Sequence, residues 1–145
     1  MAISNIFNIQ SAQMFNEIAL ETFRFQAKNN LVYKTFLTHL KTNISSIKTL
    51  NEIPFLPIPF FKSHRIISSK KSIQKTFLSS GTTGSVQSKH LITNLKVYEE
   101  SYLTGFEYFY GNIENYTVLA LLPSYLERDG SSLVYMVNDL IKKSK

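Results

Sequence analysis

Residues 77–89, with the sequence FLSSGTTGSVQSK, constrain the possible folds of this chain more than any other segment. An apolar stretch typical of a β-strand opens here into a loop that contains Gly81 and Gly84. Because glycine adopts positive φ readily, successive backbone N–H groups of such a loop can converge on an anion. Short hydroxyl side chains and one lysine add further donors. They are Ser79, Ser80, Thr82, Thr83, Ser85 and Lys89. The pattern predicts a strand followed by a phosphate-binding loop, although ordinary turns share this composition.

The loop lacks the phosphate-binding motif of the common NTPases, which is G-x-x-x-x-G-K-[ST]. Counted from Gly81, the second glycine of that motif should stand at Val86, and counted from Gly84 it should stand at Lys89. Neither position is glycine, so a different kind of phosphate loop is required.

Residues 79–84, SSGTTG, resemble the phosphate-binding signature of adenylate-forming enzymes, [ST]-[SG]-G-[ST]-T-G-x-P-K. This superfamily includes acyl-CoA synthetases, luciferases and the adenylation domains of peptide synthetases. The sequence departs from the signature at its end, where Val86 and Gln87 replace Pro-Lys and the basic residue comes later, at Lys89. The departure puts the lysine contact of the family in question and leaves the hydroxyl and glycine positions intact.

Two further segments narrow the resemblance. Residues 53–62, IPFLPIPFFK, and residues 121–128, LLPSYLER, followed by GSSLV at 130–134, resemble segments of the acyl-protein synthetases of bacterial bioluminescence. These enzymes are the ligase component of a fatty acid reductase complex, and phenylacetate-CoA ligase is a more distant relative. The resemblance runs from about Ile53 to Ile141, with the three motifs in the order of the family.

The resemblance implies an ATP-dependent ligase that activates a fatty carboxylic acid as acyl-adenylate and passes it to a protein or thiol acceptor, with ATP and Mg²⁺ as cofactors. The implied catalytic residues are Thr82, Thr83 and Lys89. The implied ATP-binding residues are Ser79, Ser80, Gly81, Thr82, Thr83, Gly84, Ser85 and Lys89. The implied acyl-binding residues are Ser124, Tyr125, Glu127 and Gly130, which would otherwise form a solvated turn.

Length and composition limit this interpretation. At 145 residues the chain has the size of one domain, whereas adenylate-forming ligases are at least about twice as long. We therefore expect an N-terminal part of such an enzyme that is inactive by itself and that either joins the remaining part of the enzyme or self-associates. The alternative is a stand-alone module that binds a nucleotide or a partner without catalysis.

The chain contains no cysteine, which excludes disulfides and thiolate metal sites and is typical of cytoplasmic proteins. It therefore has no thiol of its own that could carry an acyl group. No metal site is expected, because the histidines, among them His64 and His90, lack cysteine or histidine neighbours. There is no signal-peptide pattern at the N-terminus and no apolar run of membrane-spanning length. We expect a cytoplasmic location.

The net charge of +6 is partly concentrated in one basic run before the loop. Its members are Lys62, His64, Arg65, Lys70, Lys71 and Lys75. The run is either a solvated surface segment or an electropositive approach to the phosphate loop. Nucleic-acid binding is not expected, because no aromatic residues alternate with these charges as stacking platforms.

Hydrophobic periodicity predicts an α/β fold in which N-terminal helices precede a mostly parallel sheet with flanking helices. Residues 1–50 form the helical segment, with Ser11 and Asn30 as caps of two helices. The resemblance implies that residues 51–145 are the start of the adenylate-forming α/β domain.

Within the second segment we expect strands at 76–79, 90–92 and 116–122. The last of these is an almost continuous apolar run typical of a central strand. A long helix capped by Thr93 and ended by Gly111, and a last helix after Gly130, complete the prediction.

Overall fold

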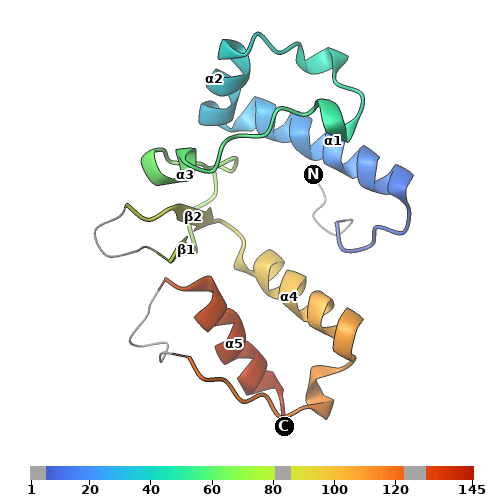
Figure 1. Cartoon of the computed structure of the whole chain (residues 1–145), viewed down its shortest axis with the longest axis vertical. Coiled ribbons are helices and arrows are strands. Elements are labelled where there is room, and N and C mark those ends of the chain that lie inside the picture. Colours follow the sequence, from blue (N-terminus) through green and yellow to red (C-terminus); the bar gives the residue numbers. More distant parts are fainter. Residues whose placement is uncertain (1–5, 81–85, 123–129) are drawn as a thin grey trace. The chain divides into compact units, whose positions relative to one another are not determined.

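The computed structural model describes residues 6–80, 86–122 and 130–145 (Figure 1). The chain forms two compact units, Met1–Lys71 and Ser72–Lys145. The first unit consists of a long helix, a shorter second helix and a segment of short elements that folds back onto them. The second unit consists of a β-hairpin and two further helices. Each unit has its own buried side chains and is described separately.

The first unit begins with α1 (Ala12–Asn29) and α2 (Leu31–His39). The hydroxyl of Ser11 accepts a hydrogen bond from the backbone N–H of Met14, and the side chain of Asn30 accepts one from Tyr33. Each of these bonds satisfies an N–H group that has no partner within its helix. Both predicted caps are therefore confirmed.

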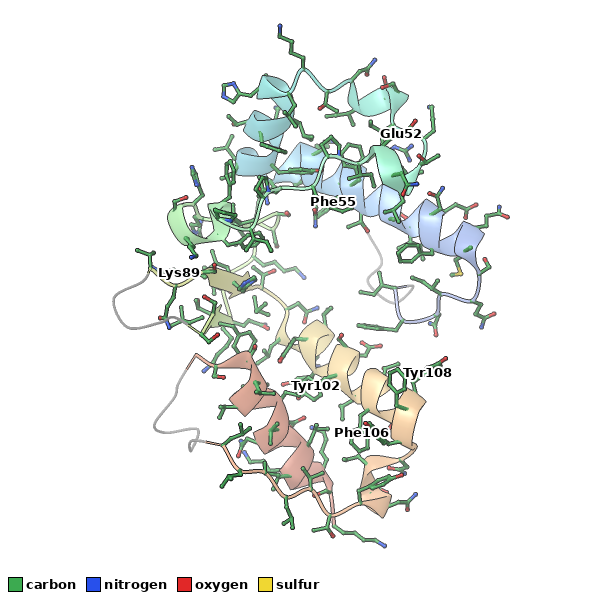
Figure 2. The ribbon with its side chains drawn as sticks, viewed as in Figure 1. Glu52, Phe55, Lys89, Tyr102, Phe106 and Tyr108 are labelled. Carbon is green, nitrogen blue, oxygen red and sulfur yellow. The ribbon has the colours of Figure 1, made fainter. Side chains whose placement is uncertain are left out.

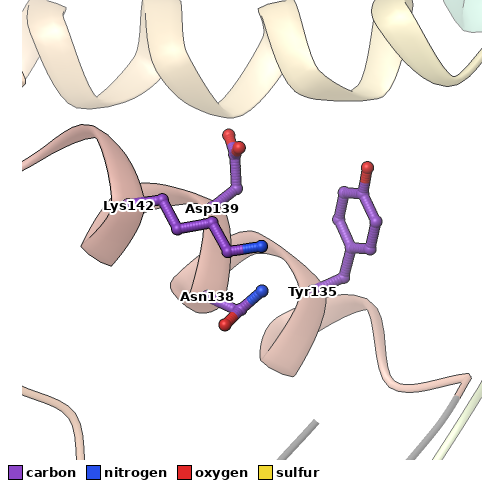
Figure 3. Close-up of a pocket in the computed structure, with 4 residues that line it drawn as sticks. All are labelled: Tyr135, Asn138, Asp139 and Lys142. Carbon is purple, nitrogen blue, oxygen red and sulfur yellow. The ribbon is translucent and has the colours of Figure 1, made fainter.

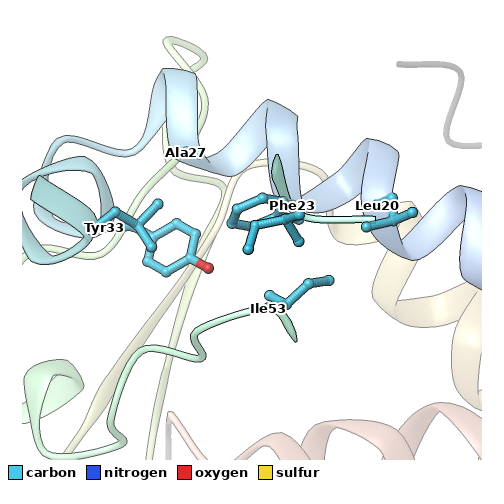
Figure 4. Close-up of a cluster of buried hydrophobic side chains, with 7 residues drawn as sticks. Leu20, Phe23, Ala27, Tyr33 and Ile53 are labelled. Atoms are coloured by element: carbon cyan, nitrogen blue, oxygen red, sulfur yellow. The ribbon is translucent and has the colours of Figure 1, made fainter. Parts of the chain in front are cut away.

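Three short elements follow in the first unit, namely η2 (Ile44–Ser46), η3 (Leu50–Glu52) and α3 (Phe60–Ser63). The segment that joins η3 to α3 folds back onto the helices, because Ile53 is buried in the same cluster as Phe23 and Tyr33 (Figure 4). The phenol of Tyr33 donates a hydrogen bond to the carbonyl of Pro54 at 2.6 Å. Residues 51–71 thus belong to the first unit, and the expected segments 1–50 and 51–145 do not coincide with the two units.

The second unit starts with the hairpin of β1 (Lys75–Leu78) and β2 (Lys89–Ile92), which pair antiparallel. In its register, Phe77 lies opposite His90 and Leu78 lies opposite Lys89. The expected strands at 76–79 and 90–92 are confirmed to within a residue. The pairing places residues 79 and 88 next to one another at the point where the ladder ends.

Helices α4 (Leu95–Tyr110) and α5 (Ser132–Lys143) complete the second unit, with η4 (Ile113–Asn115) between them. Gly111 ends α4 with φ +83°, as predicted from the preference of this position for glycine. The N-terminal cap of α4 is Asn94, so the prediction of Thr93 was wrong by one residue. Ser131 caps α5 through a hydrogen bond from the N–H of Val134.

Aromatic side chains fill the centre of the second unit. The ring of Phe77 on β1 is buried, and its centroid lies 4.9 Å from that of Tyr98 on α4 and 5.6 Å from that of Tyr135 on α5. Tyr102, labelled in Figure 2, extends this cluster with its centroid 5.3 Å from that of Tyr98. These contacts hold the hairpin and both helices together.

The predicted strand at 116–122 is not formed. This segment contains no strand, and the side chains of Leu119 and Leu121 are 90% and 102% exposed. Its first residues are held by the C-terminus, because Lys145 N–H donates to the Tyr116 carbonyl and Val118 N–H donates to the Ser144 hydroxyl. No described strand lies beside it to complete a ladder.

The described residues therefore combine helices with a small antiparallel sheet, and they do not show a mostly parallel one. None of the helices in the described ranges is long and apolar enough to cross a membrane.

Candidate functional site

The two ends of the predicted phosphate loop are hydrogen-bonded to each other. The N–H of Ser79 donates to the carbonyl of Ser88 at 3.0 Å, and the N–H of Ser88 donates to the hydroxyl oxygen of Ser79 at 2.9 Å. The side-chain amide of Gln87 donates to the carbonyl of Ser79, also at 2.9 Å. Ser88 is buried, so its backbone bonds are shielded from water. The loop therefore leaves the hairpin from a closed base.

Gly130 lies beside this base. The N–H of Leu78 donates to the Gly130 carbonyl at 2.8 Å, which joins the end of β1 to the residue before the cap of α5. Gly130 is buried and has φ +92°, and a Cβ atom here would lie 3.2 Å from Cδ1 of Leu78. The positive φ therefore favours glycine at this position, and the close approach of the Leu78 side chain adds a smaller restriction. The structure brings together two segments that the sequence analysis had linked only by resemblance.

The remaining described site residues lie at the edges of the loop. Ser79 and Ser80 follow β1, and Lys89 is the exposed first residue of β2, labelled in Figure 2. His90 follows it in the strand, opposite Phe77. Eight predicted site residues lie outside the described ranges, and their placement stays a prediction. They are Gly81, Thr82, Thr83, Gly84, Ser85, Ser124, Tyr125 and Glu127.

Sequence reasoning missed the roles of Gln87 and Ser88. Gln87 was noted only as a departure from the signature, yet its amide closes the base of the loop. Pairing the outer ends of the two predicted strands, residues 76 and 92, would place residue 79 opposite residue 89, one residue away from the observed partner. The sequence therefore held no signal that fixed this register, because a shift of one residue along a hairpin changes every pair.

A second group of polar side chains joins α4 to α5. The phenol of Tyr102 donates to a carboxylate oxygen of Asp139 at 2.5 Å, and the phenol of Tyr135 donates to Glu99 at 2.6 Å. Burial raises the pKa of Tyr102, and its hydrogen bond to Asp139 raises it further. Burial opposes ionisation of Asp139, but hydrogen bonds from Lys143 and Tyr102 outweigh it and lower the pKa of that carboxyl. The network thus pairs the neutral phenol of Tyr102 with the carboxylate of Asp139, whose charge Lys143 compensates. These contacts stabilise the packing of α4 against α5.

A shallow hollow of about 210 Å³ lies against this network, lined by Tyr135, Asn138, Asp139 and Lys142 (Figure 3). In the figure the ring of Tyr135 and the carboxylate of Asp139 point toward α4. Asp139 already has Tyr102 and Lys143 as partners, so its charge is compensated within the protein. The hollow contains none of the predicted site residues.

The basic run is divided between the units, since Lys62 to Lys71 belong to the first and Lys75 begins β1 in the second. Its role as an approach to the loop therefore stays a prediction. Among the described residues there is no cluster of three or more His, Cys, Asp or Glu that could hold a metal ion.

Comparison with models of protein families finds a match for most of the chain. A family model described as Acyl-protein synthetase, LuxE, matches residues 5–110, which include the described helices of the first unit, the whole hairpin loop and α4. No curated protein and no solved structure matches the chain significantly. The match begins well before Ile53, where the motif resemblance began, and it ends before Gly130 and α5.

Proposed function

The chain belongs to the acyl-protein synthetase family, and from this premise we propose that it contributes the ATP-phosphate-binding part of a ligase for carboxylic acids. The ligase joins a fatty acid to AMP and then transfers the acyl group to a protein or thiol acceptor. The observation that carries the proposal is the closed base of the SSGTTG loop at Ser79 and Ser88, within the matched range.

Charge is the main barrier to this reaction. A carboxylate must approach the α-phosphate of ATP, an oxygen–phosphorus bond forms, and pyrophosphate leaves with its added negative charge. Oriented N–H and hydroxyl donors stabilise such charge without a strong base, provided that they are held in place before the reaction. Thr82, Thr83 and the neighbouring glycines are the donors that we assign to the β- and γ-phosphates, with Lys89 as a point charge at the edge of the loop.

Helix α5 supports the same assignment. It starts at Ser132, two residues after Gly130, and the carbonyl of Gly130 accepts a hydrogen bond from the end of β1. The N-terminus of a helix carries a partial positive charge that favours anions. The first turn of α5 is therefore near the base of the loop and is electrostatically suited to a phosphate ligand.

Mg²⁺ fits this donor set as an ion bound mainly through the phosphates of ATP. Segment 77–89 contains no carboxylate, so it offers phosphate donors and no strong metal ligand of its own. Mg²⁺ usually combines substrate phosphates with one or two carboxylates and several waters. When bound it neutralises part of the charge on the departing pyrophosphate.

The acyl acceptor is supplied from outside these 145 residues if it is a thiol, because the chain contains no cysteine. We assign Ser124, Tyr125, Glu127 and Gly130 to the acyl substrate, since Gly130 adjoins the loop base. The carbonyl of Gly130 is already bound to Leu78, so its contribution is to shape the site through its backbone.

Trapping of the activated acid tests the proposal. The protein is purified from its own cells and supplied with ATP, Mg²⁺, hydroxylamine and fatty acids of increasing chain length. An acyl-adenylate forms a hydroxamate with hydroxylamine and releases AMP, and omission of the fatty acid is the control. Hydroxamate with any fatty acid supports the proposal, whereas its absence with the whole series would contradict it.

A further inference from the structure

We propose that Ser79 and Gln87 form a clamp that positions the phosphate loop, and that neither side chain is itself a phosphate ligand. This inference rests on the proposed function, because it concerns the same loop. It changes the role of Ser79, which the sequence resemblance grouped with the ATP-binding residues.

The argument starts from an irregularity in the hairpin. In a regular antiparallel ladder the N–H of Ser88 would donate to a backbone carbonyl. Here it donates to the hydroxyl oxygen of Ser79 at 2.9 Å, while the carbonyl of Ser79 accepts from the amide of Gln87. The hydroxyl oxygen of Ser79 thus takes the place of the Ser79 carbonyl as the acceptor for the N–H of Ser88. The Ser79 carbonyl, which would otherwise lack a partner, accepts from the Gln87 amide instead.

Ser79 consequently takes part in three hydrogen bonds. Its N–H donates to Ser88, its carbonyl accepts from Gln87, and its hydroxyl oxygen accepts from Ser88. They fix the two residues from which the loop departs, and the burial of Ser88 protects the bonds from exchange with water. The intervening residues 80–87 then have their ends held at a set separation. In general, fixed ends lower the conformational entropy that a connecting segment loses when it binds a ligand.

Gln87 occupies the position of the lysine in the adenylate-forming signature. A lysine there would present an ammonium group, whereas the neutral amide of Gln87 is turned back onto Ser79. The side chain is exposed, but its hydrogen bond points to the base of the loop. In this chain the residue at the lysine position of the signature, Gln87, therefore joins the two ends of the loop by a hydrogen bond. The first cationic side chain after it is that of Lys89.

Substitutions at the two positions test the clamp in the full chain. Ser79→Ala removes the acceptor, Ser79→Thr keeps a hydroxyl, and Gln87→Met removes the donor without adding charge. Val86→Ala is the matched control, because Val86 is a 67% exposed neighbour in the same segment. The two measurements are amide hydrogen exchange at Ser88 and the affinities for ATP and AMP, followed by NMR titration.

We expect Ser79→Ala to speed exchange at Ser88 and to weaken ATP binding about twofold to tenfold, the worth of one net hydrogen bond. AMP binding should not change, because AMP lacks the phosphates that the loop binds. Ser79→Thr should restore both properties, and Val86→Ala should change neither. Since both residues act on one loop base, Ser79→Ala combined with Gln87→Met should cost less than the sum of the single changes.

Three results would overturn the clamp. They are unchanged exchange at Ser88 in Ser79→Ala, unchanged ATP affinity despite faster exchange, and additive effects of the two substitutions. If Ser79→Ala does not fold, Gln87→Met alone decides, because loss of its exposed side chain leaves the core intact and must still weaken ATP binding. Absence of ATP binding in the unmodified chain is a different result, because it contradicts the proposed function and removes the clamp with it.

Discussion

Replacement of Gly130 by alanine is the sharpest structural perturbation of the candidate site. Gly130 has φ +92°, a conformation that residues with a Cβ atom rarely adopt. An added Cβ would also lie 3.2 Å from Cδ1 and 3.3 Å from Cγ of Leu78. The same two residues share the hydrogen bond that ties β1 to the start of α5.

The magnitude follows from three contributions. The left-handed backbone costs alanine about 1–2 kcal/mol. The contact with Leu78 adds up to about 1 kcal/mol, because the end of a leucine side chain can shift. Restriction of the unfolded chain by alanine offsets about 0.4–1 kcal/mol. At the middle of these ranges the three contributions lower the free energy of unfolding of Gly130→Ala by about 1.3 kcal/mol.

Two other glycines provide matched controls. Gly111 has φ +83° but no atom within 4 Å of an added Cβ, so Gly111→Ala isolates the backbone cost. Gly105 lies inside α4 with the same free space and without positive φ. Gly105→Ala should stabilise the protein by about 0.8–1 kcal/mol, the difference in helix propensity.

Urea unfolding followed by tyrosine fluorescence measures all three variants. Every tyrosine except Tyr33 lies in the second unit, and the chain has no tryptophan, so the signal reports mainly on the unit that contains the three glycines. We expect Gly130→Ala to be the least stable, Gly111→Ala the next and Gly105→Ala the most stable. A Gly130→Ala protein as stable as the unmodified chain would refute the reasoning about the loop base.

Three further predictions concern other parts of the chain. Burial raises the pKa of Tyr33 from 10.0 to about 12. The folded protein therefore favours the neutral phenol, and the contribution of this phenol to the free energy of unfolding should be complete below pH 10 and lost as the pH rises through 12. Tyrosinate absorbance should show Tyr33 ionising above pH 10, and Tyr33→Phe should remove this part of the pH dependence. Phe77→Ala should cost the second unit about 3–5 kcal/mol in urea unfolding, because it empties the aromatic centre, and a loss below about 1 kcal/mol would show that Tyr98 and Tyr135 hold the unit without it. The exposed apolar segment 116–122 should cause concentration-dependent association in light scattering, which Leu119→Lys with Leu121→Lys should suppress; equal association of both proteins would exclude this segment as the cause.

Local rules predicted the elements whose signals lie in a few neighbouring residues. The caps at Ser11 and Asn30 and the end of α4 at Gly111 follow from side-chain and backbone chemistry that operates within one turn. The glycine and hydroxyl pattern of the loop indicated the family that the comparison then showed.

Features that depend on distant partners were not predictable in this way. The run at 116–122 has the composition of a buried strand, but composition does not supply the neighbouring strand that a ladder requires. The contact between Leu78 and Gly130 joins residues far apart in sequence, and resemblance alone could not show it. The packing of Ile53 against α1 and α2 is also a contact between residues distant in sequence. It makes residues 51–71 part of the first unit, which ends at Lys71 and not at residue 50.

The use of the loop in adenylation is tested most directly by exchange of labelled pyrophosphate into ATP. The protein purified from its own cells is compared with its Thr82→Ala, Thr83→Ala double variant, with and without fatty acid, and circular dichroism confirms that the variant is folded. We expect exchange only with fatty acid, and its loss in the folded variant by a factor of about a hundred or more, since removal of a single such donor costs about 2.7–4 kcal/mol. Equal exchange by the two proteins would contradict the assignment of ATP phosphates to this loop.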